Sequence, residues 1–197
     1  MSDDGANLVR RRVLTAVTSA VGAVGAVGVA VPFVGSWNPS ERAKAAGAPV
    51  EINISRIEPG QMVTFEWRGK PIYVVRRTQK VLDDLAKMEP LLRDPSSEKS
   101  VQPDYVDPKF RSQKDEFLVL LGLCTHLGCA PGYQPKVGSV QISGGEWLGG
   151  FFCKCHGSKF DLAGRVLQGV PAPINLEVPP HKYLSDSVIL VGVDQEA

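Results

Sequence analysis

The sequence has almost no excess charge of either sign. It contains 22 Lys and Arg against 21 Asp and Glu in 197 residues, which gives a formal net charge of +1. A protein that binds nucleic acid through bulk positive charge needs a large basic excess, so that class is excluded. Cysteine and histidine are also scarce, at 4 and 3 residues. Four cysteines are too few for a domain built mainly from disulfides, so their spacing matters more than their number.

The composition gives little support to long helices outside the N-terminal region. Glycine and proline, at 20 and 15 residues, favour turns, loops and short strands. A hydrophobic content of 43% excludes wholesale disorder. The length therefore fits one globular domain of about 150 residues together with a further segment.

One stretch near the N-terminus lacks charge altogether. No charged residue occurs from Val13 to Ser40, whereas a membrane-spanning helix needs only about 20 apolar residues. The arginines at positions 10, 11 and 12 precede this stretch, and arginines that flank a span stay on the cytoplasmic side. The sequence predicts a cytoplasmic N-terminus over residues 1–12 and a transmembrane anchor over residues 13–35, with the rest of the chain across the membrane.

The same arginines indicate an export route. The run Arg11-Arg12-Val13-Leu14 resembles a twin-arginine signal, which exports proteins that have already folded. A cleaved Sec signal peptide is the alternative, and cleavage stays open. Residues 36–48 are mostly small and polar, apart from Trp37 at the expected membrane interface. We predict a flexible tether over these residues.

The remaining residues, 49–197, are predicted to form a mainly β domain. Apolar and polar residues alternate in three early segments, which predicts an antiparallel meander; the segments are 50–55, 63–67 and 72–75. Helical spacing with Thr78 as N-cap predicts one helix over residues 78–92. A proline-rich loop over residues 93–116 follows, and two further strands are expected at 117–121 and 187–193.

Two short blocks carry the candidate chemistry. They contain all four cysteines and two of the three histidines: Cys124-Thr125-His126-Leu127-Gly128-Cys129 and Cys153-Lys154-Cys155-His156-Gly157-Ser158. Two thiolates and two imidazoles can bind zinc, or they can hold a [2Fe–2S] cluster with both histidines on one iron. A single residue between Cys124 and His126 is tighter than zinc-finger spacing, and each block has one cysteine that a zinc site does not need.

The two blocks resemble the Rieske iron–sulfur proteins, and more narrowly the Rieske subunit of proteobacterial cytochrome bc complexes. The resemblance covers nearly the whole chain, including the segments Asn38–Ser40, Asp161–Arg165 and Gly169–Pro173. It implies a Rieske fold of antiparallel sheets with an inserted cluster-binding subdomain at about residues 122–172, preceded by one N-terminal transmembrane helix.

The resemblance also implies the roles of individual residues. The ligands of one [2Fe–2S] cluster are expected to be Cys124, His126, Cys153 and His156, with Ser158 beside the cluster and Cys129 bonded to Cys155. The proline loop that covers the cluster is expected at Gly169, Val170, Pro171, Ala172 and Pro173. His156 is the expected quinol contact and proton acceptor, and Leu127 is expected to shape the surface beside it.

The implied function is electron transfer within a respiratory, proton-translocating quinol–cytochrome c reductase. The expected partners are ubiquinol, a cytochrome b subunit and a c-type cytochrome in a dimeric complex, with the soluble domain on the periplasmic side of the inner membrane. No turnover is expected from this chain alone, because the second electron of the quinol needs a cytochrome b.

Three alternatives stay open at this stage. The small Rieske subunit of another exported oxidoreductase, such as arsenite oxidase, shares the signal, ligands and disulfide. A dioxygenase-type component lacks the extra cysteine pair and the anchor. A zinc-binding interaction module is the alternative from another class.

One residue departs from the family pattern, and several others are expected to have surface or packing roles without a part in the chemistry. Phe160 occupies the position at which high-potential members of the family usually carry Tyr. His181 is expected at the surface, and Arg76-Arg77 is expected to be a solvated strand end. Trp67 and Trp147 are expected to be packing residues.

Overall fold

The computed structural model describes residues 7–194, apart from the side chain of Ala46. The chain divides into two compact units, Met1–Ala45 and Ala46–Ala197. Each unit is described by itself.

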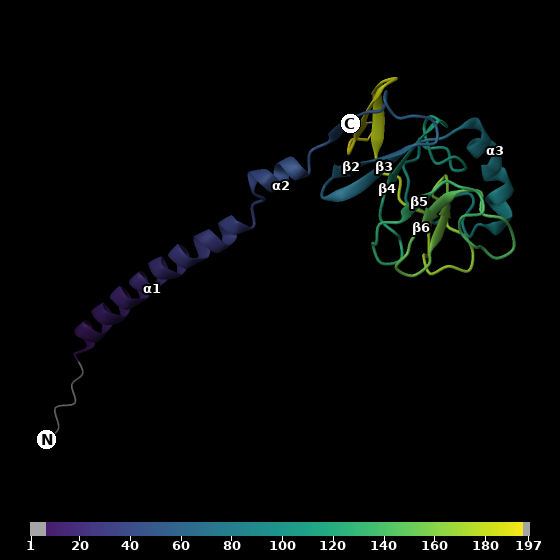
Figure 1. The fold of residues 1–197 in the computed structure, drawn as a ribbon. Helices are drawn as coiled ribbons and strands as arrows, with labels where there is room; N and C mark the ends of the chain where they lie inside the picture. Colours follow the sequence, from purple (N-terminus) through teal and green to yellow (C-terminus); the bar gives the residue numbers. More distant parts are fainter. Residues whose placement is uncertain (1–6, 195–197) are drawn as a thin grey trace. The chain divides into compact units, whose positions relative to one another are not determined.

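The first unit is dominated by α1 (Leu8–Ser36), drawn in purple to blue in Figure 1. Asn7 caps this helix, because its side chain accepts a hydrogen bond from the backbone N–H of Arg10. Every described residue of the helix is exposed. It is the one helix among the described residues that is long and apolar enough to cross a membrane, a test of length and composition that a signal sequence also passes. The anchor over residues 13–35 lies within it and stays a prediction.

The segment predicted as a tether contains a short helix. Helix α2 (Glu41–Ala46) begins after Ser40, whose hydroxyl accepts a hydrogen bond from the backbone N–H of Ala43. Lys44 forms an exposed ion pair with Glu41. The small residues of this segment, several of them alanine, are good helix formers, which composition alone did not separate from a mobile linker.

The second unit contains three antiparallel sheets of three strands each. The first is ordered β1-β9-β8, with β1 (Val50–Asn53), β9 (Val188–Val191) and β8 (His181–Ser185). The second is ordered β2-β3-β4, with β2 (Met62–Trp67), β3 (Lys70–Arg76) and β4 (Phe117–Leu121). The third is ordered β5-β6-β7, with β5 (Gly132–Gln134), β6 (Gly150–Phe152) and β7 (Lys159–Asp161).

The predicted meander is wrong in one of its pairings. Strands β2 and β3 form the expected hairpin, but β1 pairs with β9, placing Val50 opposite Val191. Alternation of apolar and polar residues shows which face of a strand is buried, but it does not say which strand lies beside it. The pairing joins the first and last strands of the domain.

The predicted helix is confirmed. Helix α3 (Gln79–Met88) begins after Thr78, whose side chain accepts a hydrogen bond from the backbone N–H of Val81. It buries Leu85 and Met88, and a single 3₁₀ turn (η1, Glu89–Leu91) continues the chain. The prolines and polar residues after it form turns and bends up to β4, as expected.

The β2-β3-β4 sheet lies between two hydrophobic clusters. One face contributes Tyr73, Val75, Leu118 and Leu120 to a cluster that includes Cys124 and Cys153. The other face contributes Ile72, Val74, Val119 and Leu121 to a cluster with β1 and β9. Successive side chains of a strand point to opposite faces of the sheet. Because a cluster covers each face, β4 is buried along its whole length. The metal blocks are thus carried on one face of a sheet whose other face packs on the β1-β9-β8 layer.

Two expectations about polar residues are wrong. His181 is 1% exposed, and its Nδ1 lies 2.8 Å from the carbonyl oxygen of Pro179. Arg77 is 3% exposed and donates to three backbone carbonyls and to the hydroxyl of Ser112. The expectation for the two tryptophans is confirmed, since Trp67 and Trp147 are both buried.

Candidate metal centre

The two cysteine–histidine blocks form two loops at the ends of short strands. The first loop leaves β4 and leads into β5, and the second connects β6 to β7. Since β5, β6 and β7 pair with one another, the small third sheet holds both loops together. Figure 1 shows β5 and β6 beside the loops of this subdomain.

The two loops have the same backbone hydrogen-bond pattern. In the first, Gly128 N donates to Cys124 O and Cys124 N donates to Cys129 O, both at 2.8 Å. In the second, Gly157 N donates to Cys153 O at 2.9 Å, and Cys153 N donates to Ser158 O at 2.8 Å. Gly128 and Gly157 both have a positive φ, near +80°, which a side chain would strain. Each block is therefore a tight loop that presents its own cysteine and histidine.

The loops bring the four predicted ligands together in pairs. The imidazole rings of His126 and His156 lie 4.8 Å apart, centroid to centroid, and are perpendicular. Cys124 and Cys153 are the two free cysteines, and both are buried. Burial raises the pKa of the Cys124 thiol, and the neighbouring Cys153 acts in the same direction.

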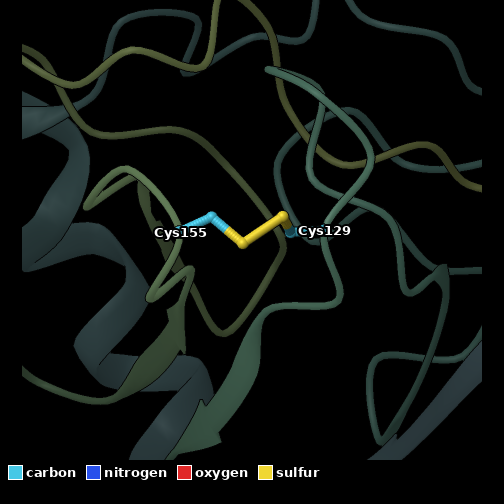
Figure 2. Close-up of a disulfide and its surroundings, with 2 residues drawn as sticks. All are labelled: Cys129 and Cys155. Carbon is cyan, nitrogen blue, oxygen red and sulfur yellow. A yellow bond between two sulfur atoms is a disulfide. The ribbon is translucent and has the colours of Figure 1, made fainter.

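The remaining two cysteines form a disulfide between the loops. The S–S bond joins Cys129 to Cys155 and confirms the predicted pairing. Figure 2 shows it bridging the two loop segments. The sulfur atoms of Cys129, Cys153 and Cys155 lie within 4.8 Å of one another. Only Cys153 of these three can supply a thiolate, because the other two are bonded to each other.

The donor set fits a [2Fe–2S] group. Nδ1 of His126 is buried and has no hydrogen-bond partner, and an unpartnered buried nitrogen is an unfavourable arrangement that a metal bond would relieve. Two buried thiols and two adjacent imidazoles match the mixed ligand set of a Rieske centre. His156 is exposed, so one of the two imidazoles faces solvent.

The predicted proline loop packs against both metal blocks. Ala172 is fully buried, and its N–H donates to the hydroxyl oxygen of Ser158 at 3.0 Å. The hydroxyl of Thr125 donates to the carbonyl oxygen of Ile174 at 2.7 Å. The neighbouring Ser158 hydroxyl opposes the effect of burial on the pKa of the Cys124 thiol. The proline loop is therefore tied to the second block through Ala172, and the residue that follows it, Ile174, is tied to the first.

Contacts that the sequence did not indicate fix this subdomain on the central sheet. The hydroxyl of Tyr73 on β3 donates to the carbonyl oxygen of Pro131 at 3.0 Å. The hydroxyl of Tyr133 on β5 donates to the carbonyl oxygen of Gly60 at 2.8 Å. A side chain at Gly122 would overlap the Tyr73 ring, 2.6 Å from its Cβ. Both tyrosines lie in regular strands, and nothing in their local sequence indicates that their hydroxyls bond to distant backbone carbonyls.

The two residues singled out beside the ligands differ in exposure. Leu127 is 70% exposed, which is unusual for a large apolar side chain in this domain. Phe160, in contrast, is fully buried on β7 opposite Phe151, so its ring packs in the core beside the second loop.

Comparison with protein families places the chain in the class that the site defines. The model described as "Rieske [2Fe-2S] domain" matches residues 99–180. A second model, described as "Ubiquitinol-cytochrome C reductase Fe-S subunit TAT signal", matches residues 1–40. The chain is a Rieske [2Fe–2S] protein with a mainly β fold.

The curated relatives narrow this class. The ubiquinol–cytochrome c reductase iron–sulfur subunit of Allochromatium vinosum is 55% identical over 195 residues, covering 99% of this chain and 94% of that protein. The subunit of the same name from Blastochloris viridis is 43% identical, with 97% of each chain covered. The chain belongs to the family of ubiquinol–cytochrome c reductase iron–sulfur subunits. Among solved structures, a chain of a hyperthermophilic respiratory Complex III is 28% identical with a TM-score of 0.47, covering 88% of this chain and 98% of that one.

Proposed function

We propose that this protein oxidises ubiquinol through a [2Fe–2S] cluster and passes the electron to a c-type cytochrome within a respiratory quinol–cytochrome c reductase. The observation that carries the proposal is the meeting of two buried thiols and two adjacent imidazoles from two disulfide-linked loops. The names of the relatives support the complex in which this chemistry takes place.

The residues that would hold the cluster are Cys124, Cys153, His126 and His156. When bound, the cluster supplies one-electron redox chemistry. Two thiolates and two neutral imidazoles contribute two negative charges, where four thiolates would contribute four, so this ligand set favours acceptance of an electron. The hydroxyl of Ser158, which is buried in the second ligand loop, would donate to a sulfur of the bound cluster and stabilise its more negative, reduced state.

The proposed proton acceptor is His156. Its exposure gives a quinol hydroxyl access to the ring nitrogen that does not bind metal. The exposed side chain of Leu127 lies on the neighbouring loop and provides an apolar contact beside it. Quinol oxidation releases protons as well as electrons, so the site needs a proton acceptor that the quinol can reach. An exposed imidazole provides one.

The proposed setting is a bacterial inner membrane. The match of residues 1–40 to an export-signal model and the apolar helix α1 support a membrane-anchored, exported protein. We place the soluble domain on the periplasmic side, with a cytochrome b subunit and a c-type cytochrome as partners in a dimeric complex. The chain alone is not expected to turn over, because the second electron of the quinol needs another acceptor.

An EPR spectrum of the full chain in detergent tests this function. After reduction with ascorbate, we expect a rhombic signal with a mean g value below that of the free electron. A signal that appears only with dithionite would indicate a low-potential centre of the dioxygenase type and contradict quinol oxidation. Absence of a signal under both conditions, with zinc found by elemental analysis, would contradict electron transfer. Co-purification of b- and c-type haems distinguishes this complex from a subunit of another exported oxidoreductase.

A further inference from the structure

A single arginine outside the metal blocks holds the proline loop by its backbone. Arg93 Nη1 donates to the carbonyl oxygen of Ala172 at 2.6 Å, and Nη2 donates to that of Val170 at 2.8 Å. The two terminal nitrogens of one guanidinium thus bind two carbonyls of the same loop. A planar guanidinium suits such paired acceptors, whereas the ammonium of lysine offers a single charged point.

The backbone around Arg93 makes this contact well defined. Its own N–H donates to the carbonyl oxygen of Val166 at 2.9 Å. The adjacent Leu92 forms a bridge with Leu167, and the Gln168 side chain donates to the carbonyl oxygen of Leu92 at 2.9 Å. The stem of the arginine is therefore fixed beside the chain that leads into the loop, even though the residue itself is exposed.

The contact continues inward to a candidate ligand. Val170 and Ala172 are buried, and the N–H of Ala172 donates to the Ser158 hydroxyl oxygen. Ser158 is fully buried, and its carbonyl oxygen accepts a hydrogen bond from the N–H of the candidate ligand Cys153 at 2.8 Å. A donor to the Ser158 oxygen constrains the direction of its hydroxyl hydrogen, because the accepting lone pair and the O–H bond must point apart.

We propose that Arg93 is a positioning residue that clamps the proline loop onto the metal centre and, through Ala172, fixes the Ser158 hydroxyl in the loop that carries Cys153 and His156. This role rests on the proposed cluster. Loosening the loop removes the N–H group that fixes the Ser158 hydroxyl, so this hydroxyl no longer has a defined direction beside the metal centre. The reduced state then loses stabilisation, and the midpoint potential falls.

Two variants separate the effect of the guanidinium's two paired hydrogen bonds from the effect of its charge. Arg93→Ala removes both, while Arg93→Lys keeps the charge and loses the paired geometry. We expect exchange of the backbone N–H groups of the loop, which belong to Gly169, Val170 and Ala172, to accelerate about tenfold in both variants of the full-length protein, as loss of charge-assisted hydrogen bonds predicts. Arg56→Ala is the matched control, because Arg56 is likewise exposed and lies outside the segments that hold this loop; it is expected to exchange as the wild type does.

The midpoint potential tests the link to the metal centre. We expect both Arg93 variants to shift the potential downward, in the same direction as Ser158→Ala and by less. In a double variant, Arg93→Ala is expected to add no further shift to Ser158→Ala, because both act through the same hydroxyl. A merely structural role would change thermal stability and leave the potential where it is.

Several results would overturn the proposal. They are unchanged exchange in Arg93→Ala, exchange in Arg93→Lys equal to that of the wild type, or additive shifts in the double variant. The hydrogen-exchange arm does not depend on the cluster. If the wild type shows no Rieske-type EPR signal but Arg93→Ala still accelerates exchange of the loop, the proposed function fails while the clamp itself is confirmed.

Discussion

At the scale of residues, the domain buries more charge beside the metal centre than its sequence indicates. Arg77, Arg111 and Arg165 are almost completely buried. Arg77 and Arg111 donate to carbonyl oxygens of residues 162–164, and Arg165 donates to the carbonyl oxygen of Leu85. Asp161 is the buried carboxylate that pairs with Arg165, at 2.8 Å. Burial lowers the pKa of Arg77 and of Arg111 to about 10 each. Both therefore stay protonated at neutral pH, and their charges are compensated largely by backbone carbonyls.

Phe160 gives a residue-scale prediction for the potential. A tyrosine hydroxyl at this position is expected to donate to a ligand sulfur, an interaction worth about 0.5–1.5 kcal/mol. Since about 1.4 kcal/mol corresponds to 59 mV for one electron, Phe160→Tyr is expected to raise the potential by some tens of millivolts. Voltammetry of the full-length protein measures the shift. Phe152→Tyr, which adds the same hydroxyl to a half-buried ring, is the control, and equal potentials in wild type and Phe160→Tyr would contradict the prediction.

His181 gives a prediction for pH dependence. Burial lowers the pKa of His181 below its ordinary value of 6.5, so the folded protein holds the neutral ring while the unfolded chain takes up a proton. Its contribution to stability is therefore complete above about pH 6.5 and is lost as the pH falls, at up to about 1.4 kcal/mol per pH unit. His181→Asn keeps a donor for the carbonyl of Pro179 and removes the titration.

Chemical denaturation of both proteins between pH 7.5 and 5.5 measures this effect. Other titrating groups are common to wild type and variant and cancel in the difference. We expect the unfolding free energy of the wild type to fall more steeply than that of His181→Asn. Parallel curves would contradict the buried, neutral histidine.

At the scale of elements, the sequence predicts where strands, the helix and the site loops occur better than it predicts which strands pair with one another. The early strands, α3 with its Thr78 cap, and the buried β4 all follow from local periodicity and capping. The partner of β1 does not, because its register with β9 depends on residues about 140 positions later. The metal blocks were predictable because the ligand chemistry confines cysteine and histidine to short, recognisable spacings.

Single polar side chains that bond to distant backbone were missed for a different reason. Arg77 and Arg93 stand among other charged or polar residues in the sequence, and their acceptors include carbonyls 85 and 79 positions away, respectively. No side-chain pattern encodes a carbonyl, since every residue carries one. Such contacts become visible only when the loops are placed in three dimensions.

The disulfide between the loops gives a prediction at this scale. The bond closes a loop with a sequence separation of 26, for which chain entropy predicts a stabilisation of about 3 kcal/mol. Cys129→Ser/Cys155→Ser is therefore expected to lower the unfolding free energy by roughly that amount and to hasten loss of the cluster's visible absorbance. Wild-type protein treated with a thiol reductant should reproduce both effects, and an unchanged denaturation midpoint in the double variant would contradict them.

At the scale of the whole molecule, the parts of the domain depend on one another across the whole of its sequence. The pairing of β1 with β9 joins its two ends, and the shared β2-β3-β4 sheet connects the metal subdomain to the β1-β9-β8 layer. The candidate ligands come from two loops that assemble only when the third sheet has formed. A cluster inserted in the cytoplasm therefore requires a folded domain, and a folded domain cannot be threaded through a channel for extended chains.

This requirement gives the final prediction, on export. Residues 1–40 match an export-signal model, and the pair Arg11-Arg12 is its predicted recognition element. Arg11→Lys/Arg12→Lys preserves the charge that orients the helix, so only recognition of the pair is expected to fail. In spheroplasts, protease added outside should digest the domain of the wild type and of the Arg10→Lys control, while the double variant stays protected. Digestion of the double variant to the same extent would show that the chain crosses unfolded, and the cluster would then have to be acquired after export, on the same side of the membrane on which the Cys129–Cys155 disulfide persists.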